Sequence, residues 1–150
     1  MSYFAAALAR TPDGWTAHEL DLDGATDVDE VADRVRDLDG SADTALLFVE
    51  EDDEYLAILR LSAAGDELRV FVSDAGAVED YPMAELFAGA VDSSSSADSL
   101  GDAGLLADLG TSGRELLALV QHEGTLPADA ITELCERAGC ADQLETLRTP

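Results

Sequence analysis

The stretch that most constrains the fold is residues 45–61 (ALLFVEEDDEYLAILRL), in which two apolar runs flank five consecutive acidic residues. The first run, residues 45–49, has no polar residue, and the second, residues 55–61, is apolar except for Arg60. Short apolar runs rich in branched and aromatic residues, separated by a polar tip, are typical of two strands joined by a tight connection. An uninterrupted apolar strand is usually covered on both faces, so we expect residues 45–49 at the centre of a sheet.

A hairpin is predicted before this stretch and another strand after it. Residues 3–20 contain two candidate strands around residues 11–14 (TPDG), where proline presets one turn dihedral and glycine tolerates a positive φ. Trp15, directly after this turn, either supports the hairpin or anchors a partner. Residues 67–73 (ELRVFVS) place alternate apolar residues on one face, as a strand does.

A helix is predicted between the hairpin and the central stretch. Thr26 or Asp27 would cap it, Asp27 and Glu30 have capping-box spacing, and valines recur at helical spacing up to about residue 38. The order is then strand, strand, helix, strand, strand, strand, with short connections. This order favours an α+β fold, in which a small antiparallel sheet has one helix packed on it.

The chain changes character after residue 90. Residues 91–104 contain the run SSSSADS and are predicted to form a flexible linker or long surface loop between a sheet domain at residues 1–90 and a helical segment at residues 105–150. We expect three to four short helices in that segment, with Ser112 and Glu115 as a capping box. Because it has few large apolar residues, it should dock on the sheet domain or on a partner.

The net charge narrows the classes of partner. The chain has 33 acidic residues against 8 basic ones, all arginine, which gives a net charge of −25 at pH 7. Such a protein repels nucleic acid phosphates and anionic lipids, so direct binding to nucleic acid or membrane is disfavoured. Binding to a basic protein partner is favoured. Genome composition or adaptation to a salty cytoplasm would explain the same charge equally well.

The protein is expected in the cytoplasm. Residues 1–10 have a short apolar run without the basic start of a signal peptide, and the longest apolar runs are far below the roughly 20 residues that span a bilayer. Cys135 and Cys140 are five positions apart near the end of a predicted helix. We expect them to be reduced structural thiols, with a disulfide or redox switch as the alternative.

The motifs of common enzymes are missing from the sequence. It contains no GxxxxGK[ST] or GxGxxG phosphate loop, no GxSxG elbow and no HExxH helix. We therefore expect no catalytic residues, no cofactor and no metal.

The acidic run is the one candidate site. It consists of Glu50, Glu51, Asp52, Asp53 and Glu54. Carboxylates suit divalent cations, but calcium loops alternate ligands with spacer residues and have a glycine at the bend, and this run does neither. We expect a solvent-exposed hairpin tip that is a candidate contact for a basic partner.

Five stretches together resemble a known family. The stretches SYFAAALARTPDGW, LLFVEEDDEYLAILR, VFVSDA, LLADLG and LPADAITELCERAG are similar to the actinobacterial tRNA adenosine deaminase-associated proteins. The similarity covers nearly the whole chain, with the Ser-rich segment as its variable part. The family name implies a link to the enzyme that converts adenosine to inosine in tRNA, and the family has no established catalytic residues.

The chain does not resemble the deaminase itself. A zinc deaminase needs H-x-E and P-C-x-x-C to hold its metal and move protons. Here His18 and His122 are followed directly by glutamate, without the spacer residue. Cys135 and Cys140 are too far apart and lack the preceding proline.

Three hypotheses follow, in order of preference. The first is a non-catalytic accessory protein that contacts a tRNA adenosine deaminase. The second is an acidic structural or interaction module with an unrelated partner, for which a homodimer through a sheet edge or the helical segment is one option. The third is an enzyme whose site no motif reveals.

Overall fold

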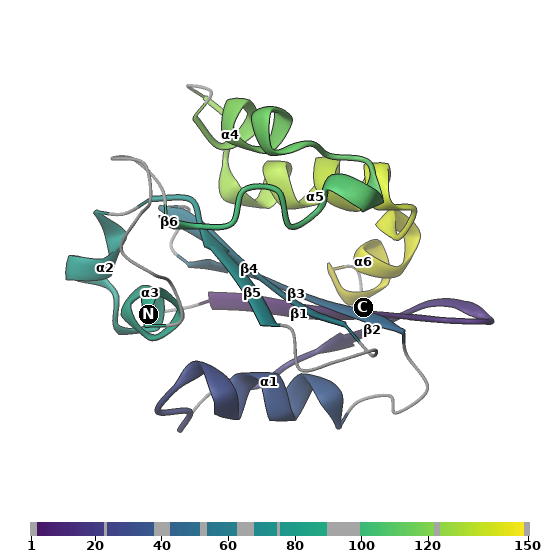
Figure 1. The fold of residues 1–150 in the computed structure, drawn as a ribbon, viewed down its shortest axis with the longest axis horizontal. Helices are drawn as coiled ribbons and strands as arrows, with labels where there is room; N and C mark the ends of the chain where they lie inside the picture. Colours follow the sequence, from purple (N-terminus) through teal and green to yellow (C-terminus); the bar gives the residue numbers. More distant parts are fainter. Residues whose placement is uncertain are drawn as a thin grey trace.

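The computed structural model describes residues 3–22, 24–37, 43–51, 54–62, 68–74, 76–89, 100–121 and 124–148. In this part of the chain one antiparallel sheet has the strand order β2-β1-β3-β4-β5-β6 (Figure 1). Its strands are β1 (Tyr3–Thr11), β2 (Gly14–Glu19), β3 (Thr44–Glu51), β4 (Tyr55–Ser62), β5 (Leu68–Val72) and the two-residue β6 (Leu100–Gly101). The helices are α1 (Val28–Arg36), α2 (Ala77–Asp80), α3 (Pro82–Ala88), the 3-10 helix η1 (Ala107–Leu109), α4 (Gly113–Gln121), α5 (Pro127–Ala138) and α6 (Ala141–Arg148). The predicted α+β class is confirmed.

Strand β3 lies in the middle of the sheet, as its apolar run predicted. It pairs with β1 on one side and with β4 on the other. Leu46 and Leu47 are both completely buried, although they are neighbours and point to opposite faces. Each face of the sheet is therefore covered by its own layer of helices.

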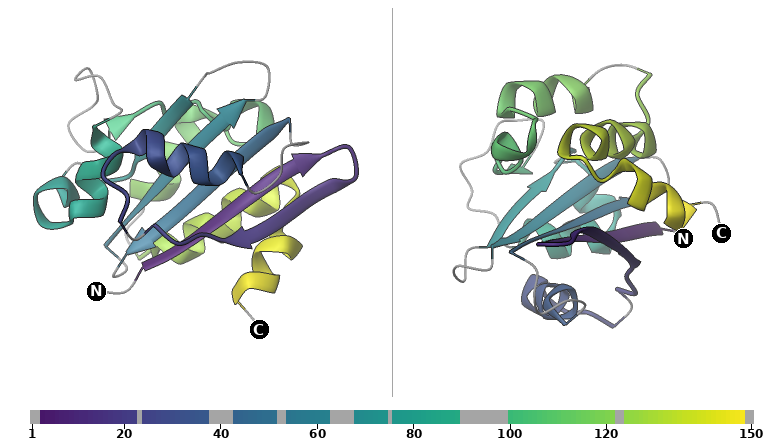
Figure 2. Two further views of the ribbon diagram at one scale, coloured as in Figure 1. Left: turned by 90° about the horizontal axis from the view of Figure 1, so that it is seen from below. Right: turned by 90° about the vertical axis from the view of Figure 1, so that its right-hand side faces the viewer.

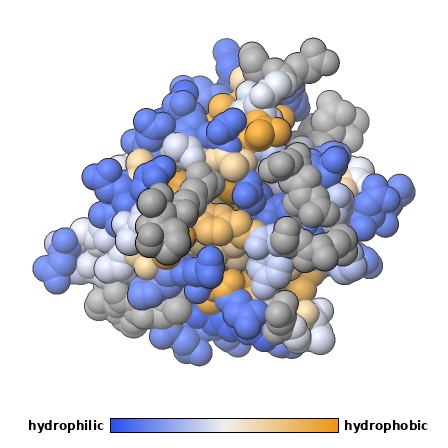
Figure 3. Space-filling view, turned by 180° about the vertical axis from the view of Figure 1, so that it is seen from behind, coloured by the Kyte–Doolittle hydropathy of each residue, from blue (hydrophilic) through white to orange (hydrophobic). Residues whose placement is uncertain are grey.

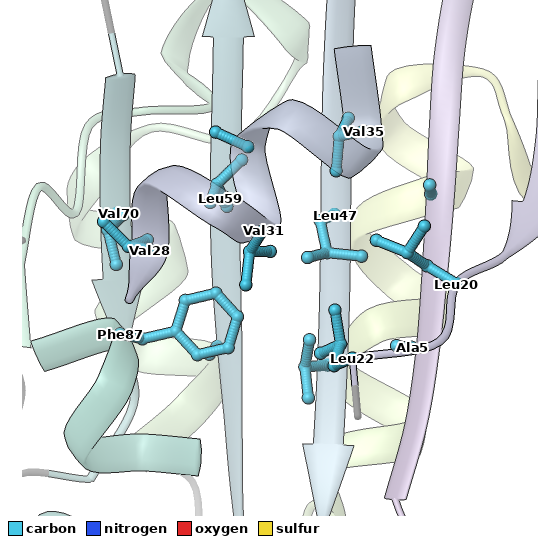
Figure 4. Packing of buried hydrophobic residues seen from close by; sticks show 14 of the residues in the cluster. Ala5, Leu20, Leu22, Val28, Val31, Val35, Leu47, Leu59, Val70 and Phe87 are labelled. Carbon is cyan, nitrogen blue, oxygen red and sulfur yellow. The ribbon is translucent and has the colours of Figure 1, made fainter. Parts of the chain in front are cut away.

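Helix α1 covers the first face together with α3. Asp27 caps α1, because its carboxylate accepts a hydrogen bond from the Glu30 N–H at 2.9 Å. The buried valines of α1 lie over Val70, Leu59 and Leu47, and Phe87 of α3 fills the space beside them (Figure 4). This first core cluster forms because the valines recur at helical spacing while the strand residues alternate.

Helices α4, α5 and α6 cover the second face (Figure 2). They bury a separate core cluster that includes Phe48 of β3, Ile58 of β4 and Ile131 of α5. The predicted capping box is present. The Glu115 carboxylate accepts from the Ser112 N–H at 3.1 Å, and the Ser112 hydroxyl accepts from the Glu115 N–H at 3.2 Å. The helical segment thus packs on the sheet, one of the two outcomes expected for it.

Arg60 ties this layer to the sheet. It lies in the middle of β4 with only 5% of its surface exposed. Its guanidinium donates to both carboxylate oxygens of Asp108, at 2.8 Å for the Nη2–Oδ2 pair, and to the Leu105 carbonyl at 2.7 Å. These contacts lower the pKa of the Asp108 carboxyl from 3.8 to about 2, mainly through the hydrogen bond from Arg60.

The chain enters this layer through β6, where only glycine fits. Gly101 has a φ of +97°, and a Cβ there would lie 2.0 Å from the Val70 carbonyl oxygen. Most of the predicted linker, residues 91–99, lies outside the described residues. The division into a sheet domain at 1–90, a linker at 91–104 and a helical segment at 105–150 stays a prediction.

Both cysteines are buried, and no disulfide joins them. Cys135 lies in the last turn of α5, and Gly139, with a φ of 92°, reverses the chain after that helix. The N–H groups of Gly139 and Cys140 both donate to the Cys135 carbonyl at 2.9 Å, and the bond from Gly139 is that of an αL helix cap. A hydrogen bond with Cys135 lowers the pKa of the Cys140 thiol.

Candidate functional site

The acidic run is less exposed than the sequence predicted. Glu51 is 4% exposed, and the Tyr55 hydroxyl donates to its carboxylate at 2.8 Å. Glu50 is half-buried and Glu54 is exposed, while Asp52 and Asp53 lie outside the described residues. The expectation of a fully solvated tip is therefore wrong for Glu51. It is buried because it is the last residue of β3 and lies opposite Tyr55, the first residue of β4.

Glu54 lies instead at the rim of a groove of about 250 Å³. Residues at the start of β4 and just after β5 line one side of it, and residues from the end of α4, the start of α5 and positions 125–126 line the other. The lining residues are Glu54, Leu56, Ser73, Asp74, Val120, Thr125, Leu126, Pro127 and Ala130. The two sides come from segments about 50 to 70 residues apart in the chain.

The β4–β5 side of the groove is held by the backbone. The Ser73 hydroxyl accepts from the Leu56 N–H at 2.9 Å, and the Ser73 N–H donates to the Leu56 carbonyl at 2.9 Å. Asp74 is exposed, and its Oδ1 accepts from the Gly76 N–H at 2.9 Å. A short turn therefore fixes the Asp74 carboxylate at the rim.

The other side presents an apolar residue to solvent. Leu126 is 47% exposed, the highest exposure of a large apolar side chain among the described residues. It directly precedes Pro127, the first residue of α5, and the Ala130 N–H donates to its carbonyl at 3.0 Å. The helix start thus holds Leu126 in place with its side chain partly in water.

The groove combines exposed carboxylates with the partly exposed apolar side chain of Leu126. Glu54 and Asp74 supply carboxylates, and no arginine is among the residues described as lining it. Such a surface can accept an apolar side chain that has a cation beside it. Among the residues the structure describes, no three His, Cys, Asp or Glu side chains gather where they could hold a metal ion.

The remaining surface is dominated by acidic residues. Figure 3 shows one face on which hydrophilic residues surround smaller apolar patches. Six arginines in the described ranges form ion pairs with carboxylates: Arg10, Arg34, Arg36, Arg60, Arg69 and Arg137. Most of the positive charge is therefore already paired within the protein, and the excess carboxylates face solvent.

This charge predicts that salt stabilises the fold. Self-repulsion between unpaired carboxylates destabilises the compact state, and salt screens it within a Debye length of about 10 Å at 0.1 M. We expect the melting temperature to rise between low and molar sodium chloride, as followed by circular dichroism. A melting temperature that stays flat or falls over this range would contradict the prediction.

The other candidates from the sequence lie elsewhere. His18 is half-buried in the edge strand β2, and His122 lies outside the described residues. Trp15 is half-buried and packs against the second core cluster. The centroid of its ring lies 5.8 Å from the Arg10 guanidinium carbon. This packing agrees with the first of its two predicted roles, support of the hairpin, and the second role, an anchor for a partner, stays a prediction.

Comparison with known proteins identifies the family. A family model described as Rv3753c-like tRNA adenosine deaminase-associated protein matches residues 3–141. The chain belongs to this family. No curated protein and no solved structure matches it. The match runs from β1 to the first residue of α6, so the resemblance seen in the five sequence stretches is confirmed.

Sequence reasoning missed the two residues that complete the groove with Glu54. Asp74 and Leu126 are far from the acidic run in the sequence, and only the fold brings them beside it. One signal was available for Leu126, a large apolar residue placed just before the proline that starts a helix.

In the part of the chain the structure describes, no helix is both long and apolar enough to cross a membrane.

Proposed function

We propose that this protein is a non-catalytic accessory protein that binds a tRNA adenosine deaminase in the cytoplasm by protein–protein contact. The observation that carries the proposal is the family match over residues 3–141, since the family is described as associated with that enzyme. The net charge of −25 supports it. An enzyme that binds tRNA must offer cations to phosphates, and an acidic protein is electrostatically complementary to such a surface.

Two effects on the enzyme are compatible with such binding. Docking over the tRNA-binding surface would compete with tRNA and inhibit deamination. Docking elsewhere on a basic surface would leave the tRNA site open and stabilise the folded enzyme, because a ligand that binds only the folded state raises its stability. Deaminase assays and melting curves of the enzyme, with and without this protein, distinguish the two.

The test of the proposal is complex formation between the two purified proteins. We expect binding at low salt by calorimetry and gel filtration, with affinity falling as salt increases because exposed charges are screened. An unrelated protein of similar size and net charge is the control for nonspecific attraction. No binding to the deaminase even at low salt, or equal binding by the control, would refute the proposal.

Two further measurements separate the alternative hypotheses. Incubation of this protein alone with tRNA should form no inosine in the tRNA, since we assign it no catalytic role. Light scattering separates monomer from dimer, and the outer edge of β2 or the helical segment would be the contact surface of a homodimeric module. A dimer that shows no affinity for the deaminase would favour the alternative of an acidic module with an unrelated partner.

A further inference from the structure

We propose that the groove between the β4–β5 end and the α4–α5 connection receives a basic segment of the partner protein. One apolar side chain of that segment would pack on Leu126, and a neighbouring arginine or lysine would bind Glu54 and Asp74. This inference rests on the proposed function for the partner's identity. It adds which surface binds and which residue types it recognises.

Leu126 supplies the apolar part of the proposed contact. The described ranges bury their other large apolar side chains more fully, and this one is 47% exposed beside a concave wall. Val120 is half-buried on the same side of the groove, whereas Leu56 and Ala130 are buried beneath it, so an inserted side chain would contact mainly Leu126 and Val120. Residues with this placement commonly act as binding anchors, because a complex removes their surface from water.

Two carboxylates at the rim of the groove supply the charged part of the proposed contact. Glu54 and Asp74 are both exposed, and no arginine is among the described lining residues. A guanidinium or ammonium group bound next to an apolar surface is partly shielded from water, which strengthens its attraction to carboxylates. Nucleic acid and anionic lipid are excluded by the same carboxylates, so the occupant that fits is a cationic protein segment.

The groove walls are formed before any partner arrives. Ser73 makes two hydrogen bonds with the backbone of Leu56 at the start of β4, one as donor and one as acceptor. In the first turn of α5, the Ala130 N–H donates to the Leu126 carbonyl. A rigid site loses little conformational entropy on binding, which favours affinity. The volume of about 250 Å³ suits one or two side chains. It is below the roughly 300–1,000 Å³ of a typical small-molecule pocket.

The experiment compares two groove variants with a matched control in binding to the purified deaminase. Glu54→Gln with Asp74→Asn removes the rim charges, and Leu126→Ala removes the anchor. Asp13→Asn with Glu19→Gln is the control, because it removes the same charge from exposed positions at the β1–β2 hairpin. Melting temperatures establish that each variant is folded.

We expect each groove variant to bind about tenfold more weakly and the control to bind nearly as well as wild type. The rim variant should also show a weaker salt dependence, whereas Leu126→Ala should keep the wild-type salt dependence. Wild-type affinity in both groove variants would overturn the groove proposal and leave the proposed function standing. Failure of the wild-type protein to bind the deaminase would overturn both.

Discussion

Replacement of Phe48 by alanine is expected to lower the free energy of unfolding by about 3–5 kcal/mol. Phe48 is completely buried in β3, lies opposite Ile58 of β4 and belongs to the core cluster under α4–α6. The substitution removes the apolar contacts of the ring and leaves a cavity that β3, paired on both sides, cannot close. Small domains have a total stability of about 5–15 kcal/mol, so the loss is a large share of it.

Urea unfolding, followed by the fluorescence of Trp15, measures this loss. Glu145→Ala, at an exposed position on α6, is the control and should change stability by less than about 0.5 kcal/mol. A loss below about 1 kcal/mol for Phe48→Ala would contradict the buried position of the ring.

The same variant tests the separation of the two cores. Because the cavity lies under α4–α6, amide exchange should accelerate more in α5 than in α1. Phe87→Ala, on the opposite face, should cause a loss of similar size with the reverse pattern, since Phe87 belongs to the first core cluster. Equal acceleration in both helices for both variants would show that the layers unfold as one unit.

The second large effect is expected at the Arg60–Asp108 pair. Arg60→Ala should cost about 3 kcal/mol, because it removes two contacts to Asp108 and leaves the Leu105 carbonyl without its donor. Asp108→Asn should cost less, about 1–2 kcal/mol, because the Asp108 side chain is 62% exposed and water screens the pair. Chemical denaturation of both single variants and the double variant gives the coupling. Additive losses would show that the pair contributes nothing.

Asp108 also gives this pair a defined acid sensitivity. Its pKa in the folded protein is lowered from 3.8 to about 2, so the folded state favours the ionised form. The stabilisation is therefore complete above about pH 4 and is lost as the pH falls from there toward 2. In acid titrations, wild type should lose more stability than Asp108→Asn over this window. Parallel curves would contradict the assignment, because the other carboxylates titrate in both proteins.

Much of the fold could be predicted because its signals are local. The alternation in residues 67–73, the capping pair Asp27 and Glu30, and the box formed by Ser112 and Glu115 each act within a few positions of the chain. Backbone geometry connects such patterns directly to strands and helix ends. The uninterrupted apolar run of β3 likewise predicted a strand covered on both faces.

The candidate site could be predicted only in part. Glu54 was in the predicted contact, and it lies on the rim of the groove. Glu51 looked equally exposed in the sequence, but strand pairing places it against Tyr55, which satisfies its carboxylate. No rule based on spacing identifies that partner, because it depends on where β3 ends and β4 begins.

The sequence by itself determined strands β1 to β5, helix α1, the helical character of the C-terminal segment, the strong negative charge and the family, since each of these depends on composition or on neighbouring residues. The tertiary structure alone decided the strand order, the docking of α4–α6 on the second face and the meeting of Leu126 with Glu54 and Asp74. These features need contacts between distant segments. Such contacts are selected by the total apolar surface buried and by the polar groups satisfied, which no local pattern records.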